Sequence, residues 1–158
     1  MRDRLTLHAI ENDGSVRAAP APLSDIAQQV ARATADMYVT NGFDKPWIGY
    51  LAALDERVVG TCGFKTPPRA GRVEIAYFTF PDFEGRGIAT RMASALLALA
   101  HEQAAATLVA AQTLPVRNPS HRILEKLGFR HVDTIQHPED GTVWEWQHDP
   151  RGAASDTE

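Results

Sequence analysis

The stretch that decides the fold runs from Val73 to Thr90 and reads VEIAYFTFPDFEGRGIAT. Its first eight residues are mostly β-branched or aromatic, which is typical of a strand. Pro81 and Asp82 end that strand, and the turn Gly85-Arg86-Gly87 leads into a long helical pattern. The N–H groups in the first turn of a helix have no partner within the helix, and the helix dipole favours negative charge there. We therefore predict an anion site at this turn, suited to a phosphate group.

Two well-known phosphate loops fit this stretch poorly. A dinucleotide-binding loop needs Gly-x-Gly-x-x-Gly, but Thr90 occupies the third glycine position and several expected strands precede the loop. A Walker loop needs Gly-Lys-Ser/Thr, and the sequence has no Gly-Lys pair. A tight strand-to-helix turn without a ligand remains the structural alternative.

The segments around this stretch predict a mixed α/β sheet. Short loops join the strands expected at 47–54, 58–65 and 72–80, which favours antiparallel pairing. A helix that begins at Ile88 then crosses to a strand expected at 107–114. The remaining expected elements are a strand at 4–10, a helix between Ser24 and Gly42, a short helix at 118–128, and strands at 129–136 and 142–147.

The helix expected between Ser24 and Gly42 carries one apolar stripe. Ser24 is a good N-cap, and Gly42 is placed to end the helix. The stripe follows helical spacing, and we expect it to pack against the sheet. Its members are Ile26, Val30, Ala33 and Met37.

Composition indicates an ordinary globular chain. The 158 residues are 44% hydrophobic and 23% charged, so residues 1–150 are expected to form one domain and 151–158 a disordered tail. A formal charge of −4 argues against nucleic-acid binding. No signal segment is visible, and the apolar run 93–100 is too short to span a membrane. The single cysteine, Cys62, fits a cytoplasmic location, and the histidines show no metal-binding spacing, so we expect no metal.

A second informative stretch runs from Arg117 to Phe129 and reads RNPSHRILEKLGF. Asn118 as N-cap with Pro119 at the first helical position is sound capping chemistry, and Gly128 suits the end of the helix. Capping therefore explains much of this stretch. It does not explain why the first helical turn presents Ser120, His121 and Arg122.

Together, the two stretches resemble the GNAT superfamily of acyl-CoA-dependent N-acyltransferases. The pyrophosphate loop of that family reads Arg/Gln-x-x-Gly-x-Gly/Ala. Gly87 and Ala89 match it, and Glu84 departs from it at the first position. The second stretch is similar to a helix of the branch related to ribosomal-protein N-acetyltransferases. The resemblance spans residues 47–146 and implies a GNAT fold, with a central mixed, mostly antiparallel sheet, splayed parallel strands in its middle, and helices on both faces.

This resemblance implies acetyl-CoA as the acyl donor, held in a cleft between the splayed strands. Backbone amides of Phe78 and Phe80 would bind the pantetheine arm, and the turn amides from Gly85 to Ala89 would bind the pyrophosphate. A further amide of the splayed strand would meet the carbonyl oxygen as charge develops on it. The expected cofactor-binding residues are Phe78, Thr79, Phe80, Gly85, Arg86, Gly87, Ile88, Ala89, Thr90 and Asn118.

Two residues are expected to act on protons. Glu74 lies near the place where family members carry a catalytic carboxylate, which implies a general base, and a solvated strand glutamate is the structural alternative. Many members supply a tyrosine acid four residues before the final glycine of the second stretch, but Leu124 stands there. Ser120 matches a serine of the ribosomal-protein branch and is the expected partner of the leaving thiolate, ahead of His121.

The function implied is transfer of acetyl from acetyl-CoA to a primary amine, by direct attack in a ternary complex. The branch resemblance favours a protein or peptide α-amino group as acceptor, small amines remain open, and the charge of −4 favours a cationic acceptor. An acyl-CoA-binding module without turnover is the alternative, and the last strands allow a homodimer. Four aromatic residues are expected to line the acceptor pocket or to belong to the core, namely Tyr38, Trp47, Tyr50 and Phe64.

Overall fold

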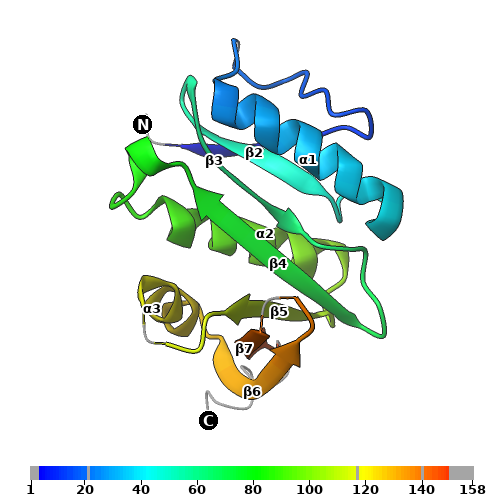
Figure 1. The fold of residues 1–158 in the computed structure, drawn as a ribbon, viewed down its shortest axis with the longest axis vertical. Coiled ribbons are helices and arrows are strands. Elements are labelled where there is room, and N and C mark those ends of the chain that lie inside the picture. Colours follow the sequence, from blue (N-terminus) through cyan, green and yellow to red (C-terminus); the bar gives the residue numbers. More distant parts are fainter. Residues whose placement is uncertain (1–3, 21, 117, 140, 150–158) are drawn as a thin grey trace.

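A seven-stranded sheet in the order β1-β2-β3-β4-β5-β7-β6 forms the centre of the computed structural model (Figure 1). The structure describes residues 4–20, 22–116, 118–139 and 141–149, so the tail expected at 151–158 lies outside the described residues. The strands are β1 (Leu5–Ala9), β2 (Gly49–Leu54), β3 (Arg57–Phe64), β4 (Arg72–Thr79), β5 (Leu108–Thr113), β6 (Arg130–His137) and β7 (Gly141–His148). The helices are α1 (Asp25–Asn41), the short 3-10 helix η1 (Pro81–Phe83), α2 (Ile88–Gln103) and α3 (Pro119–Lys126).

Only the central pair of strands is parallel within the described sheet. β1 to β4 pair antiparallel in chain order, and β5, β7 and β6 form a second antiparallel set. The crossover helix α2 lets β5 run parallel to β4. Their register ends where Glu74 lies opposite Ala110, and beyond this point the two strands diverge towards α3 (Figure 1). The predicted fold class, a mixed sheet with splayed parallel strands, is confirmed.

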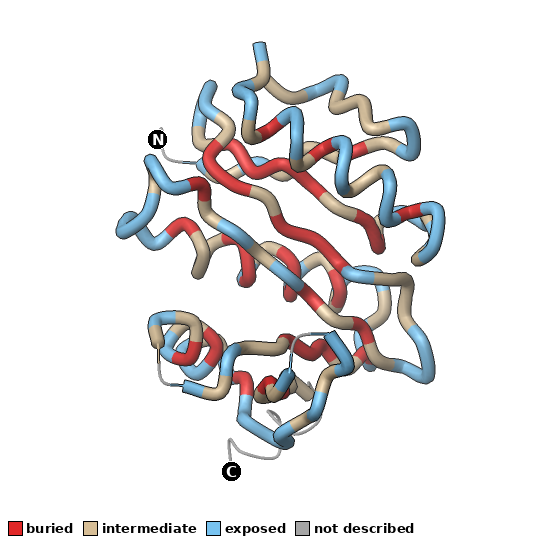
Figure 2. Tube along the Cα trace, viewed as in Figure 1, coloured by how far each residue is buried: buried red, intermediate tan, exposed pale blue. Residues whose placement is uncertain are grey.

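Helices cover both faces of the sheet. Figure 1 shows α1 in front of the sheet and α2 behind it, and buried residues concentrate on the strands between them (Figure 2). Ile88, Met92 and Leu96 of α2 are fully buried, at the spacing of four residues that is typical of one helix face. None of the described helices is both long enough and apolar enough to cross a membrane. Between the two helix layers, the sheet is interrupted where β4 and β5 diverge.

The face that α1 turns to the core differs from the predicted stripe. Ala27, Ala31 and Tyr38 are buried against the sheet. Val30 is only half-buried, and Met37 is 50% exposed. Alanine side chains let the helix backbone approach the sheet closely, so the core uses the small residues and leaves larger apolar side chains at its margin. Of the predicted stripe, Ile26 and Val30 are partly buried and pack against the core. The prediction is wrong for Ala33 and Met37, which are exposed.

Candidate active site

An open cavity of about 630 Å³ lies where β4 and β5 diverge. Its walls come from the end of β4, the turn before α2, the first turn of α2 and the start of α3. The tertiary structure therefore brings the two informative stretches of sequence to one cavity. Of the residues predicted to bind the cofactor, the lining contains Phe78, Thr79, Gly85, Gly87, Ile88, Ala89, Thr90 and Asn118. The rest of the lining is Tyr77, Glu84, Pro119, Ser120 and Ile123.

The turn before α2 has the open geometry that an anion site needs. Gly85 and Gly87 adopt φ angles of 80° and 74°, in the left-handed region that favours glycine. A Cβ atom at either position would meet no atom within 4 Å, so the space beside the turn is open. Gly87 caps α2 without a side-chain hydrogen bond, and the first-turn N–H groups have no partner within the helix. This turn fits the pyrophosphate of a CoA molecule.

Two residues predicted to bind the cofactor do not line this cavity. The Arg86 guanidinium lies over the ring of Phe83, 5.7 Å from its centroid. Phe80 is 2% exposed, and its N–H donates to the carbonyl oxygen of Val59 at 2.9 Å. The predicted contact of the Phe80 amide is therefore corrected, because the sheet uses that N–H group, whereas the contact of Arg86 stays a prediction.

Backbone alternation along β4 decides which amides face the opening. The backbone groups of Glu74 and Phe80 both bond to β3 or its continuation. In an antiparallel pair, every second residue turns its N–H and C=O groups to the same neighbour, so Phe78 faces β3 as well. Tyr77 and Thr79 turn their amides to the other side, where β5 has diverged. The prediction that the Phe78 and Phe80 amides hold a pantetheine arm is wrong by one residue.

The start of α3 presents Ser120 to the cavity. Asn118 caps the helix, because its side-chain oxygen accepts the Ser120 N–H at 2.9 Å. Ser120 also lines a neighbouring cavity of about 280 Å³ between β4 and β5. Leu124 is fully buried, so the position of the family's tyrosine belongs to the core here. His121 is buried as well, beside two tryptophan rings of β7 with centroids 5.1 and 5.2 Å away.

Tyr77 is a candidate site residue that the sequence interpretation missed. Burial raises the pKa of Tyr77 to about 12, and the nearby Ser120 side chain opposes part of this rise. The phenol is therefore protonated at neutral pH. Tyr77 lines both cavities between the strands. The available signal is its place in an otherwise apolar strand that is expected to splay, but a tyrosine in such a strand is more often part of a core.

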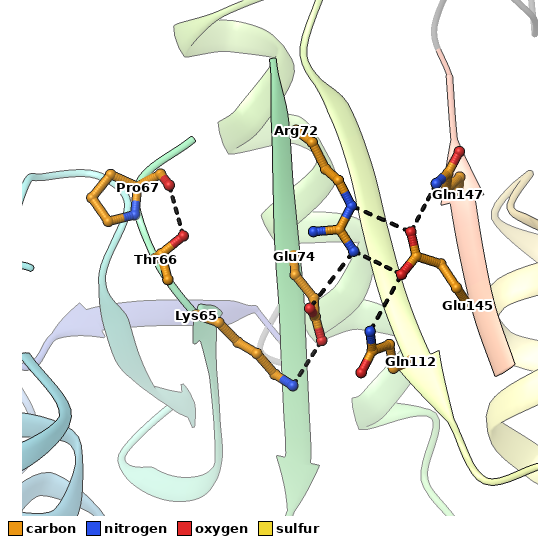
Figure 3. Close-up of polar contacts among 8 residues, drawn as sticks. All are labelled: Lys65, Thr66, Pro67, Arg72, Glu74, Gln112, Glu145 and Gln147. Carbon is orange, nitrogen blue, oxygen red and sulfur yellow. Dashed lines mark hydrogen bonds and ion pairs between the residues drawn. The ribbon is translucent and has the colours of Figure 1, made fainter. Parts of the chain in front are cut away.

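Glu74 lies at the closed end of the splay, inside a chain of alternating charges (Figure 3). Its carboxylate is 2.7 Å from the Lys65 ammonium and 3.8 Å from the Arg72 guanidinium. Arg72 in turn lies 2.7 Å from Glu145 on β7. Burial would raise the pKa of Glu145, but hydrogen bonds from Gln147, Arg72 and Gln112 hold it below its usual value. Glu74 is therefore an ion-paired carboxylate beside the cavities rather than a solvated one on their walls.

A third pocket, of about 210 Å³, lies on the α1 side of the sheet. It shares Ala76 and Tyr77 with the cavity of about 280 Å³. Three cavities therefore adjoin at one short segment of β4. All four aromatic residues expected either to line an acceptor pocket or to belong to the core are buried core residues, and Tyr38 and Phe64 also line this third pocket.

Cys62 also lines this third pocket. Burial raises the pKa of the Cys62 thiol to about 12, so the thiol is unreactive at neutral pH. Within the described ranges, no group of three or more His, Cys, Asp or Glu residues could hold a metal ion.

Comparison with known proteins supports the fold and the family of this chain. No curated protein matches the chain. Similar folds include a GNAT-family acetyltransferase of Bacillus anthracis (18% identity, 96% of this chain and 98% of that one, TM-score 0.66). The ribosomal L7/L12 α-N-protein acetyltransferase RimL, solved with coenzyme A, is 12% identical over 92% of this chain and 93% of that one, with a TM-score of 0.67. A chimera of the Vibrio cholerae spermidine N-acetyltransferase with hSSAT is 13% identical over 95% of this chain and 98% of that one, with a TM-score of 0.66. The model of the acetyltransferase (GNAT) domain family matches residues 2–130, so the chain belongs to the GNAT acetyltransferase family.

Proposed function

We propose that this GNAT acetyltransferase moves acetyl from acetyl-CoA to a primary amine by direct attack within a ternary complex. The observation that carries this proposal is the meeting of three cavities at Tyr77. One of them contains the anion-binding turn, and another opens on the opposite, α1 side of the sheet. Donor and acceptor can thus approach the same point of β4 from two sides.

The donor side of the site is built mainly from backbone groups. The first-turn amides of α2 would bind the pyrophosphate, and the amides of Tyr77 and Thr79 would bind the pantetheine arm. Asn118 caps α3 through its side chain and also lines the cavity. Acetyl-CoA supplies an activated acyl group, and these residues hold it at the widening of the sheet.

The acceptor amine must be neutral to attack. At pH 7, deprotonating a lysine amine costs about 4 kcal/mol and an α-amino group about 1 kcal/mol. Glu74 lies on β4 two residues before Ala76, and its partner Lys65 lines both cavities that Ala76 lines. Glu74 would receive the proton from the amine through an intervening water molecule.

The leaving thiolate needs a hydrogen-bond donor. Ser120 lines the cavity where the thiol would leave, and Tyr77 lines the same cavity beside it. Because the phenol stays protonated, the pair can present an O–H group to the sulfur at neutral pH. Ser120 would donate to the sulfur, with Tyr77 holding its hydroxyl in position.

The favoured acceptor is a protein or peptide α-amino group or a small primary amine. The fold is shared by RimL, an α-N-protein acetyltransferase of ribosomal L7/L12, and by a spermidine acetyltransferase. The second candidate function is an acyl-CoA-binding module without turnover. Two observations favour it, the acidic Glu84 in the lining of the anion site and the buried Leu124 in the place of the family's acid.

Thermal unfolding with acetyl-CoA, and with NAD and ATP as controls, tests the donor. A ligand at 100 times its Kd adds about 2.7 kcal/mol, roughly 5–10 °C in Tm for a domain of this size. Release of free thiol with a panel of amines then tests turnover. A shift with acetyl-CoA alone, followed by amine-dependent thiol release, would support the enzyme. A shift without thiol release for any amine would favour the binding module, and no shift at millimolar acetyl-CoA would contradict both.

A further inference from the structure

The pocket on the α1 side has an apolar wall. Val30 and Met37 lie two turns apart on α1, and Phe64 and Phe78 face them from β3 and β4. Met37 is 50% exposed and Phe78 is 47% exposed, although both are large apolar side chains. Met37 and Phe78 are therefore not part of the buried core. Their exposed surface is available to cover an apolar group of a ligand.

The charge of the pocket is as informative as its apolar wall. No aspartate or glutamate lines it, all of its lining residues being described, and its one charged residue is Lys65. The Lys65 ammonium already has a partner, the Glu74 carboxylate at 2.7 Å. A second ammonium group entering this pocket would lose its hydration, gain no carboxylate and approach a like charge. A polycationic acceptor therefore fits this pocket poorly, despite the overall charge of −4.

The size of the pocket sets the size of the group. Its volume is about 210 Å³, and an apolar cavity of about 150 Å³ already holds benzene. A phenyl ring with a short tether, or a leucine or methionine side chain, would fill it. Ala76 and Tyr77 join the pocket to the cavities between β4 and β5, so a group seated here would direct its tether at that point.

From these observations, and resting on the proposed function, we propose that the acceptor is a primary amine whose neighbouring group is uncharged and apolar, about the size of a phenyl ring. An N-terminal residue with such a side chain and a small arylalkylamine share this chemistry. The pocket between α1 and β4 selects the acceptor by burying that group. Lys65 adds to the selection by repelling a second ammonium group.

The test compares matched amines with the full chain and saturating acetyl-CoA. Thiol release is measured with 2-phenylethylamine and with 1,4-diaminobutane, and then with short peptides that begin with Phe or with Lys. We expect kcat/KM to be at least tenfold higher for each apolar acceptor than for its cationic counterpart. Equal or higher kcat/KM for the cationic acceptors would overturn the inference and leave the proposed function intact.

A pair of variants on α1 ties the preference to the pocket. Val30→Asp places a carboxylate in the wall and should remove the preference for 2-phenylethylamine or reverse it. Val39→Asp is the matched control, because Val39 is 88% exposed on the same helix and does not line the pocket. The control should keep the wild-type ratio of kcat/KM values. An unchanged ratio in Val30→Asp, with Tm close to that of the control, would contradict the inference.

Binding without turnover separates this inference from the proposed function. Tm is measured with CoA present and each amine in excess. If 2-phenylethylamine raises the Tm of the wild type but not that of Val30→Asp, while no amine releases thiol, the pocket assignment stands and the enzyme proposal fails. If neither amine raises Tm or releases thiol, both proposals fail.

Discussion

The carboxylate of Glu74 lies 2.7 Å from the ammonium of Lys65, at the last position where β4 and β5 are still paired. This ion pair joins the residue after β3 to β4 at the point where the splay begins (Figure 3). Lys65 lines two of the three adjoining cavities, whereas Glu74 lines none of them. The pair thus places a base beside the site and keeps its charge balanced in the absence of a substrate.

Glu74→Gln should lower kcat strongly and leave the affinity for acetyl-CoA nearly unchanged. Removal of a general base typically costs 10²–10⁴-fold, and Glu74 does not line the cavity assigned to the donor. Steady-state thiol release gives kcat, and thermal shifts give the donor affinity. Lys65→Met serves as the control, because it removes the ion pair but keeps the carboxylate. Unchanged kcat in Glu74→Gln would remove Glu74 from the mechanism.

Ser120→Ala should lower kcat by about 10–100-fold without unfolding α3. The cap of α3 is the side chain of Asn118, which accepts from the Ser120 N–H group and is kept in this variant. Tyr77→Phe should have a smaller effect, and the double variant should be no slower than Ser120→Ala, because the two hydroxyl groups act as one unit. Additive losses in the double variant would show that Tyr77 does not act through Ser120.

Asn118→Ala separates capping from chemistry at the same turn. Loss of the cap should cost about 1 kcal/mol of unfolding free energy, measured by denaturant unfolding. Ser120→Ala should cost less than half of that amount. The reverse order of the two losses would contradict the assignment of Asn118 as the cap.

Glu84→Gln should lower the KM for acetyl-CoA by about 2–10-fold, and the gain should shrink as salt is added. The reason is that an exposed carboxylate in the lining of the anion site repels a pyrophosphate. Asp82→Asn is the matched control, since Asp82 is exposed nearby but does not line the cavity. An equal effect of both variants would indicate only a general change of net charge.

Glu145→Gln should make the protein less stable at neutral pH and its stability less sensitive to acid. Glu145 has a pKa below its usual 4.5 in the folded state. Its contribution is therefore complete above about pH 4.5 and is lost as the pH falls through the lower folded-state value. Loss of the partner of Arg72 should cost about 1 kcal/mol at pH 7, because the arginine can still reach water. Parallel curves of unfolding free energy against pH for the two proteins would contradict this assignment.

Local patterns predicted the elements of this fold well. The glycine turn before α2, the Asn118 cap and the spacing of Ile88, Met92 and Leu96 all act within a few residues, so sequence spacing alone carries them. The order of elements predicted a helix crossover between β4 and β5, and the family resemblance added that these parallel strands splay. A helix crossover between strands leaves few alternatives.

Orientation was harder to predict than position. The α1 stripe was assigned to the core, but close approach of the helix selected Ala27 and Ala31 and left Met37 at the pocket. Register along β4 likewise decided that Tyr77 and Thr79, rather than Phe78 and Phe80, turn their amides to the opening. A shift of one residue in the register of β4 would turn the other set of amides to the opening. The hydrophobic pattern does not fix that register where β4 has no partner strand on one side.

The sequence by itself determined the glycine turn before α2, the cap of α3 and the family of this protein, because these depend on backbone conformations and contacts within short segments. Only the tertiary structure decided the charge of the pocket on the α1 side, the pairing of Glu74 with Lys65, and the placement of Tyr77 beside Ser120. Each of these joins residues from different elements. Their distances follow from how helices and strands pack, and spacing along the chain does not contain that information.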